Sequence, residues 1–291
     1  MAEMERAADG PIAGTLRGGV ELGVVGLETL THLSLFSGIG GVDLAAEWAG
    51  FETVGQCEWA DYPTKVLEKH WPDVPRWRDI HELTAENFRD RTGIERPILI
   101  SAGFPRQPHS LAGKRKGTAD ERELWGECAR VIRVLKPKWI LGENVPGLLS
   151  SESGRFFGRI LRDLANMGYD ARWCMYPAAW VGAGHKRERV FFVSNSASHR
   201  WNSLGEKQQN KCSDVYTQLL ETWRDDTVNL LSHVERSLDN PSGGVQRNDN
   251  GFSEGVERLK CLGNAVVPQQ VYPILAAIAE VEAATKTTKG E

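Results

Sequence analysis

Residues 30–50 read Leu30-Thr-His-Leu-Ser-Leu-Phe-Ser-Gly-Ile-Gly-Gly-Val-Asp-Leu-Ala-Ala-Glu-Trp-Ala-Gly50. The apolar run at 30–36 predicts a buried strand, and 42–49 predicts a helix that is followed by a glycine. A second strand is expected over 51–57 and a second helix over 60–70. This order of strand, helix and strand predicts the α/β class, with a mostly parallel sheet and helices on both faces.

The same alternation continues along the chain. Further strands and helices are expected at 97–101, 120–135, 138–142, 156–167, 169–177, 189–194 and 269–284. The stretch 195–257 is rich in Asn, Gln, Ser, Gly and Asp and predicts a small separate region. We therefore expect a main domain over 31–194 to which 258–284 returns, and a poorly ordered extension over 1–30.

Composition limits the function classes. The chain has 291 residues, 41% hydrophobic and 25% charged, which is ordinary for a globular protein. The sequence predicts neither a membrane span nor a secretory signal, so we expect a cytoplasmic monomer without membrane contact. The five cysteines are scattered, without a CxxC pair, which indicates reduced thiols. A net charge of −4 means that any binding of nucleic acid depends on local basic patches.

The glycine-rich turn after the first strand is a candidate ligand loop. Phe36-Ser-Gly38-Ile-Gly40-Gly41 would bring backbone N–H groups to a ligand at the start of a helix. Glu58, after the second strand, could bind a ribose diol, and Asp79 could accept a hydrogen bond from an adenine amino group. The structural alternatives are that Glu58 caps the next helix and that Asp79 is a solvated turn residue.

A nicotinamide-binding domain is the rival interpretation of this loop. It would require Gly-x-Gly-x-x-Gly, but here Asp43 stands at the position of the third glycine. The spacing therefore disfavours a dinucleotide site.

A second loop follows the strand predicted at 97–101. It reads Ser101-Ala-Gly-Phe-Pro-Arg-Gln-Pro-His-Ser110, and its glycine and prolines predict an irregular path. It would lie at the carboxyl edge of the sheet, where open α/β sheets bind ligands.

The motifs, taken in order, resemble those of the DNA cytosine-5 methyltransferase family of bacteria and phages. Besides the two loops, the matching stretches are Glu143-Asn-Val145, His185-Lys-Arg-Glu-Arg189, with His where glutamine is often found, and Leu262-Gly-Asn-Ala-Val-Val-Pro268. The resemblance implies a Rossmann-like S-adenosylmethionine-dependent methyltransferase fold with a small irregular target-recognition region at 195–257. It also implies duplex DNA as the partner, and a place in DNA methylation and restriction–modification.

What the resemblance implies for chemistry is a covalent route. In this family a cysteine thiolate adds to carbon 6 of a flipped cytosine, and a buried glutamate engages N3. Carbon 5 then attacks the methyl group of S-adenosylmethionine. By position, Glu143 would be that glutamate, with a raised pKa, and Arg187 and Arg189 would hold the base. The cofactor would contact Phe36, Gly38, Gly40, Glu58, Asp79, Ile80, Asn264 and Val266. The alternatives are a turn carboxylate for Glu143 and surface charges for the two arginines.

One residue departs from the family pattern. Arg106 stands where the family carries its nucleophilic cysteine in a Pro-Cys-Gln loop. A guanidinium has no free lone pair near neutral pH, because its pKa lies above ~12. No other cysteine falls in the loop; Cys57 is the nearest to a motif, but it belongs near the ribose. We expect the enzyme to be inactive or severely impaired as written.

The loop around Arg106 is basic and suits contact with DNA phosphates. The expected DNA contacts are Gln107, Ser110, Lys114, Arg115 and Lys116. The recognition region at 195–257 is by contrast slightly acidic, which is a poor footprint for DNA.

Two accounts of Arg106 stay open: an inactivating substitution, natural or introduced, or the working residue of a silent DNA- or cofactor-binding protein. A relative acting on cytosine in transfer RNA is a third, lower-ranked reading.

Overall fold

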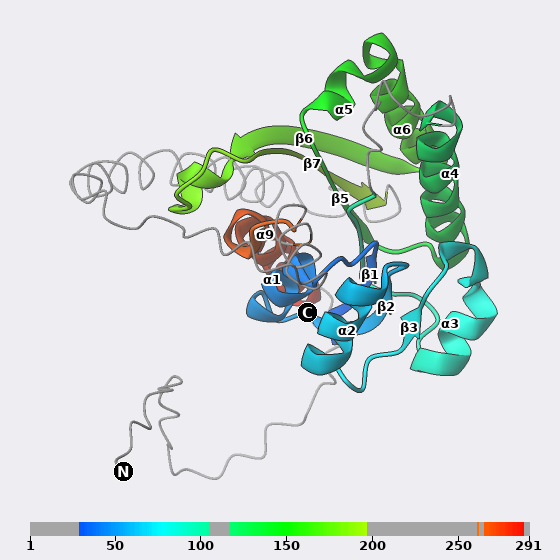
Figure 1. The fold of residues 1–291 in the computed structure, drawn as a ribbon. Helices are drawn as coiled ribbons and strands as arrows, with labels where there is room; N and C mark the ends of the chain where they lie inside the picture. The colour runs from blue at the N-terminus through cyan, green and yellow to red at the C-terminus, as the bar shows by residue number, and fades with distance from the viewer. Residues whose placement is uncertain (1–28, 105–116, 197–260, 262–264, 288–291) are drawn as a thin grey trace, which may run out of the picture.

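The computed structural model describes residues 29–104, 117–196, 261 and 265–287, with the backbone only for 117–123 and 286–287. Within them, seven strands form one sheet in the order β3-β2-β1-β4-β5-β7-β6 (Figure 1). The strands are β1 (Thr31–Leu35), β2 (Glu52–Cys57), β3 (Arg76–Trp77), β4 (Leu99–Ala102), β5 (Trp139–Asn144), β6 (Tyr169–Pro177) and β7 (Glu188–Ser196). The first five are mutually parallel, and β7 runs antiparallel to both β5 and β6.

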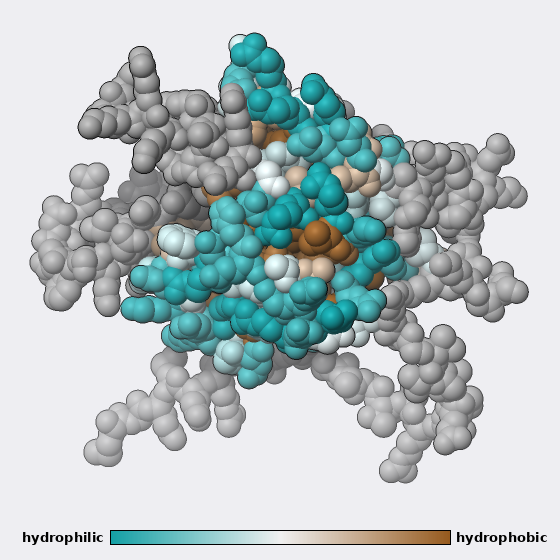
Figure 2. All heavy atoms as spheres, turned by 90° about the vertical axis from the view of Figure 1, so that its right-hand side faces the viewer, coloured by the Kyte–Doolittle hydropathy of each residue, from teal (hydrophilic) through white to brown (hydrophobic). Residues whose placement is uncertain are grey.

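Helices cover both faces of the sheet, as the sequence predicted. They are α1 (Gly41–Trp48), α2 (Asp61–His70), α3 (Ala85–Thr92), α4 (Gly117–Leu135), α5 (Gly147–Ser150), α6 (Arg155–Asn166) and α9 (Pro268–Thr287), with short 3-10 turns η1 (Ile80–Glu82), η2 (Ser151–Gly154) and η3 (Ala178–Val181). Helices α1 and α9 bury their apolar sides on one face. Helices α3, α4 and α6 pack on the other. The outer surface on the side turned to the viewer in Figure 2 is largely hydrophilic, with one small hydrophobic area.

Successive side chains of each central strand alternate between these two cores, because strand residues point alternately to opposite faces. Leu99 and Leu141 pack with α1 and α9, whereas Ile100 and Ile140 pack with α4 and α6. Strands β4 and β5 are buried on both faces and are mostly apolar, so they appear as apolar runs in the sequence, whereas β1 and β2 also bury polar side chains.

All strands and helices expected from the sequence are present, with ends shifted by a few residues. The sequence analysis missed β3, η1, α3, α5, η2 and η3. The reason is physical: β3 has only two residues, and α3 buries a single side chain, Phe88, so neither leaves a periodic apolar pattern. The expected extension at 1–30 and separate region at 195–257 lie almost wholly outside the described residues. Among the described residues no helix combines the length and apolarity of a bilayer span.

Beneath α1 the sheet carries a buried polar network. Asp43, fully buried in the first turn of α1, accepts hydrogen bonds from the Ser34 hydroxyl (3.0 Å) and from the Gln56 amide (2.9 Å). Arg76 Nε in turn donates to Gln56 Oε1 (2.9 Å). Burial raises the pKa of Asp43 to about 6, and the hydrogen bonds only partly oppose this effect. The network therefore connects α1, β1, β2 and the edge strand β3. It does so through a buried carboxyl group whose ionised form is disfavoured by burial.

This network gives a pH-dependent stability. A carboxyl whose folded pKa is raised stabilises the fold below its unfolded pKa and loses that contribution as pH rises through the folded value. We expect the stability advantage of wild type over Asp43→Asn to shrink by about 2 to 3 kcal/mol between about pH 4 and pH 7. Urea unfolding across this range measures it. The matched control is Asp73→Asn at an exposed aspartate, where the difference should stay flat; a flat difference for Asp43→Asn as well would contradict the expectation.

Candidate cofactor and catalytic site

The glycine-rich loop between β1 and α1 contains three residues with positive φ. Phe36 and Gly38 have φ of +56°, and Gly40 has φ of +85°. The Gly38 N–H donates to Glu58 Oε2 at 2.8 Å, so the loop is tied to the end of β2. No described residue comes within 4 Å of a methyl group built at Gly38, so the described part of the chain leaves the space beside it open. The loop therefore presents backbone at an accessible surface.

Glu58 is anchored by two backbone N–H groups. Its second oxygen, Oε1, accepts from Ala60 at 2.8 Å, directly before α2. The capping alternative considered from the sequence is thus part of its role. Each carboxylate oxygen can accept more than one hydrogen bond, so this anchoring leaves capacity for a ligand.

The other two glycines of the loop allow close packing. A side chain at Gly40 would lie 2.4 Å from the ring of Trp71, and one at Gly41 would lie 2.7 Å from the carbonyl oxygen of Val266. Val266 belongs to the C-terminal motif, which the sequence analysis assigned to the same site as the loop. The structure brings these two motifs into contact.

A cavity of about 480 Å³ lies at this junction. Gly40 and Gly41 line it together with His70, Arg187 and Val266, among others. The remaining predicted cofactor residues of the described part do not line it: Phe36, Gly38, Glu58, Asp79 and Ile80. The cavity thus joins the glycine loop to the C-terminal motif and to Arg187, but Glu58 and Asp79 do not line it.

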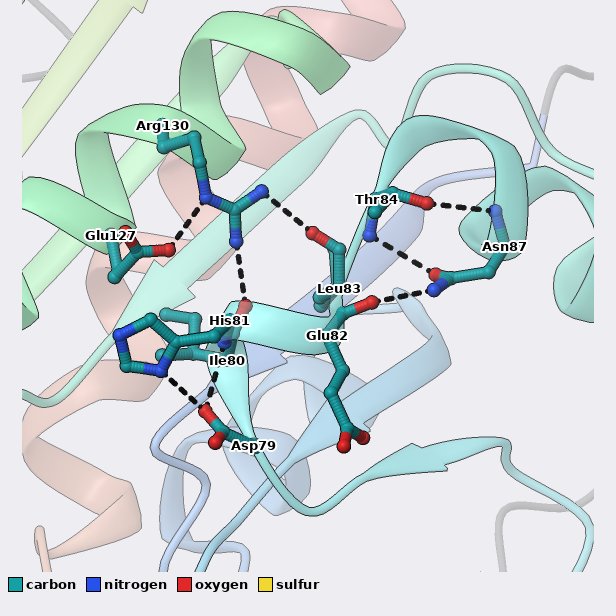
Figure 3. A network of polar contacts seen from close by, with 9 residues as sticks. All are labelled: Asp79, Ile80, His81, Glu82, Leu83, Thr84, Asn87, Glu127 and Arg130. Carbon is teal, nitrogen blue, oxygen red and sulfur yellow. Dashed lines mark hydrogen bonds and ion pairs between the residues drawn. The ribbon is translucent and has the colours of Figure 1, made fainter.

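Asp79 caps the short turn η1. Its Oδ1 accepts from the backbone N–H of His81 at 2.9 Å and lies 2.6 Å from His81 Nδ1 (Figure 3). The backbone hydrogen bond, followed by the side-chain one, lowers the pKa of Asp79, so it is ionised at neutral pH. Ile80, the next predicted residue, is buried.

Glu143 and Arg189 form an ion pair at the carboxyl edge of the sheet. Glu143 lies near the end of β5, and its Oε1 is 2.7 Å from Arg189 Nε on β7. Burial raises the pKa of Glu143, and the charges of Arg189 and Arg187 oppose that rise. A side chain on Gly103 would lie 3.5 Å from Glu143 Oε2, so the carboxyl group faces the first residue after β4. The structure thus places Glu143 beside the entry to the loop that carries Arg106.

The residues around this pair connect it to the neighbouring motifs. The Asn144 amide donates to the Phe104 carbonyl at 2.9 Å and so holds the chain just before the loop. Arg187 has a φ of +31°, a strained value for a side chain of its size, and it donates to the carbonyl of Ala265. Arg187 is therefore tied to the C-terminal motif, whereas Arg189 is tied to Glu143.

Several predicted site residues lie outside the described residues. They are Arg106, Gln107, Ser110, Lys114, Arg115, Lys116 and Asn264.

The sequence analysis passed over two described residues beside the candidate site. Trp59 follows Glu58 and is 73% exposed, which is unusual for a tryptophan. The signal available was an aromatic residue directly after a candidate ribose-binding acid. Arg130 on α4 contacts the turn that carries Asp79 and Ile80, and no sequence pattern indicated this contact.

Comparison with known proteins identifies the family. The family model for C-5 cytosine-specific DNA methylases matches residues 30–249. Type II methyltransferase M.BsuFI of Bacillus subtilis is 34% identical over 165 residues, which cover 56% of this chain and 39% of that protein. Type II methyltransferase M.HhaI of Haemophilus parahaemolyticus is 32% identical over 168 residues, covering 57% of this chain and 49% of that protein.

A solved structure agrees with this result. The crystal structure of a protein described as a DNA modification methyltransferase encoded within a prophage (E. coli) has a TM-score of 0.51 and 25% sequence identity. The match covers 58% of this chain and 47% of that one. In these comparisons the chain spans less than three fifths of the relative's length. The fold class and the family resemblance predicted from the motifs are confirmed: this chain belongs to the C-5 cytosine-specific DNA methylase family.

Proposed function

We propose that this chain is a DNA cytosine-5 methyltransferase scaffold that binds S-adenosylmethionine and duplex DNA, and that Arg106 abolishes or severely reduces its methyl transfer. One observation carries the proposal: the buried acid Glu143, paired with Arg189, lies against Gly103 at the entry to the loop where the family has its nucleophile. The domain organisation proposed with it is a cofactor domain over 31–194, completed by 258–284, and a recognition region over 195–257.

The residues at the end of β2 and around the glycine loop fit the cofactor. Gly38 is only partly buried, and the carboxyl oxygens of Glu58 and Asp79 are acceptors suited to a ribose diol and an adenine amino group. The exposed ring of Trp59 offers a stacking surface for the adenine. When bound, the cofactor supplies an electrophilic methyl group.

Glu143 and the two arginines fit the flipped base. Because burial raises its pKa, Glu143 keeps its proton to higher pH than a free glutamate and can donate it to N3 of cytosine. Arg189, held against this carboxyl, and Arg187, fixed by the C-terminal motif, can hold the carbonyl oxygen of the base. These groups together bind and polarise the ring but do not supply a nucleophile.

Three of the four described cysteines, Cys57, Cys128 and Cys174, are poor substitutes for the missing thiolate. Burial raises the pKa of Cys57 to about 12 and of Cys174 to about 11, and it raises the pKa of Cys128 further. A thiol with such a pKa stays protonated at neutral pH, and the thiolate is the reactive form. This supports loss of methyl transfer rather than rescue by one of these three thiols, and it keeps a silent DNA- or cofactor-binding protein as the second candidate function.

Restoring the thiol tests the proposal. We expect Arg106→Cys to raise transfer of labelled methyl groups from S-adenosylmethionine to mixed-sequence duplex DNA by more than roughly 100-fold over wild type, because loss of a covalent nucleophile costs at least that much. Arg106→Ala is the matched control and should stay at background. Equal activity in both variants, or wild-type activity that survives removal of all five cysteines, would contradict the mechanism. Excess transfer RNA as competitor tests the RNA alternative in the same assay.

The role of Glu143 can be tested in the Arg106→Cys background. Adding Glu143→Gln should lower transfer by roughly 100-fold, the scale of one lost proton donor. In Arg106→Cys itself, the rate should fall as pH rises through the raised pKa of Glu143, because the protonated form is the donor. The exposed Glu280→Gln is the control. If the Glu143 variant keeps full activity, this carboxyl is not the donor.

The cofactor site is tested by calorimetry with S-adenosylhomocysteine. A charged hydrogen bond contributes about 1.5 to 3 kcal/mol, so Glu58→Gln should weaken binding by roughly 10-fold to 100-fold. Glu52→Gln, at an exposed glutamate at the opposite end of β2, should leave the affinity unchanged. Equal affinity in the two variants would remove Glu58 from the proposed site.

A further inference from the structure

Helix α4 reaches across to the turn η1 through a single side chain. The Arg130 guanidinium donates to the carbonyl of Ile80 at 2.7 Å and to the carbonyl of Leu83 at 2.9 Å (Figure 3). Its Nε is 2.5 Å from Glu127 Oε2, one turn earlier on α4. The Arg130 side chain is 31% exposed and that of Glu127 is 21% exposed. These hydrogen bonds are therefore partly shielded from water. Charged hydrogen bonds are stronger in such a partly buried position than in full contact with solvent.

The shape of η1 is determined largely by side chains. Besides the two carbonyls that Arg130 binds, the carbonyl of Glu82 accepts from the Asn87 amide on α3. At the start of the turn, the Asp79 carboxylate accepts from the His81 backbone. Two helices and one capping acid thus hold a turn of three residues.

A guanidinium fork that donates to two carbonyls fixes the orientation of a turn as well as its distance. Ile80 and Leu83 lie on either side of the turn, so their carbonyls define how it is rotated. Asp79, directly before the turn, is rotated with it. Both bonds from His81 fall on one oxygen of Asp79, Oδ1, which fixes the carboxylate relative to η1 and leaves its other oxygen to be directed by the turn.

We propose that Arg130 is a positioning residue for the cofactor: by fixing η1 it aims the Asp79 carboxylate at the adenine amino group and sets the position of Ile80 beside it. The proposal rests on the proposed cofactor site and adds the residue that shapes its adenine end. Helix α4 begins at Gly117, after the stretch that contains Arg106. Through Arg130, adenine recognition would therefore depend on this helix.

The test compares two probes, S-adenosylhomocysteine and S-inosylhomocysteine, in which a carbonyl oxygen replaces the adenine amino group. Wild type should prefer the adenosyl compound by at least about tenfold, since the inosyl carbonyl faces the Asp79 carboxylate. Arg130→Gln should weaken the adenosyl compound by about tenfold and the inosyl compound much less, so the preference falls towards one. Loss of folding alone would weaken both equally, which makes the ratio the decisive readout.

Control variants separate the outcomes. Arg133→Gln, an exposed arginine one turn further along α4, should keep the wild-type preference. Arg130→Lys keeps the charge without the fork and should retain only part of the preference; it also serves if Arg130→Gln folds poorly. The Asp79→Ala variant should already bind the adenosyl and inosyl compounds equally well. Adding Arg130→Gln to it should therefore not change the ratio of the two affinities. Wild-type preference in Arg130→Gln and Arg130→Lys would overturn the inference alone, whereas a wild-type protein that binds neither compound would overturn the cofactor site and the inference together.

Discussion

The register of the central strands is the constraint on which the site depends. Leu35 pairs with Cys57 on one side and with Ala102 on the other, and Ala102 pairs with Gly142. Phe36, Glu58 and Gly103 directly follow β1, β2 and β4, and Glu143 is the residue after Gly142 on β5. All four therefore lie at the same level of the carboxyl edge. A shift of one residue in any pair would turn the side chains of that strand to the opposite face and bury or expose the wrong group. The glycine loop, the two acids and the start of the Arg106 loop are neighbours because the sheet aligns them.

Two buried acids in this fold are stabilised in different ways. Asp43 accepts from neutral donors, Ser34 and Gln56, with Arg76 one hydrogen bond further away. Glu143 has a guanidinium in direct contact. Burial raises the pKa of both, but only at Glu143 do adjacent positive charges counter it. The Asp43 network supports the glycine loop from below, whereas the Glu143 pair lies at the carboxyl edge of the sheet and faces Gly103.

The sequence predicted the architecture well because buried parallel strands are continuous apolar runs and the helices between them are amphipathic or followed by glycine. It failed at β3, η1, α3, α5, η2 and η3, which are all short, and at η1 side-chain contacts such as those of Asn87 and Arg130 hold the chain. The positions of Glu58 and Glu143 followed from motif order. The contact of Glu143 with Arg189, and that of Arg130 with the Ile80 carbonyl, join residues from distant segments, so only the folded topology brings them together.

The reversed strand β7 has a consequence for how the site is assembled. In a wholly parallel sheet, every strand would deliver side chains to the carboxyl edge only after the chain had crossed the full height of the layer. Because β7 runs the other way, its first residues arrive at that edge directly from the end of β6, where Pro177 pairs with Glu188. Val190 then lies opposite Asn144, which sets Arg189 beside the acid of β5. The β6–β7 pair thus supplies Arg189 without a crossover helix. The geometry of these two antiparallel strands determines where the Arg189 guanidinium meets the Glu143 carboxyl group.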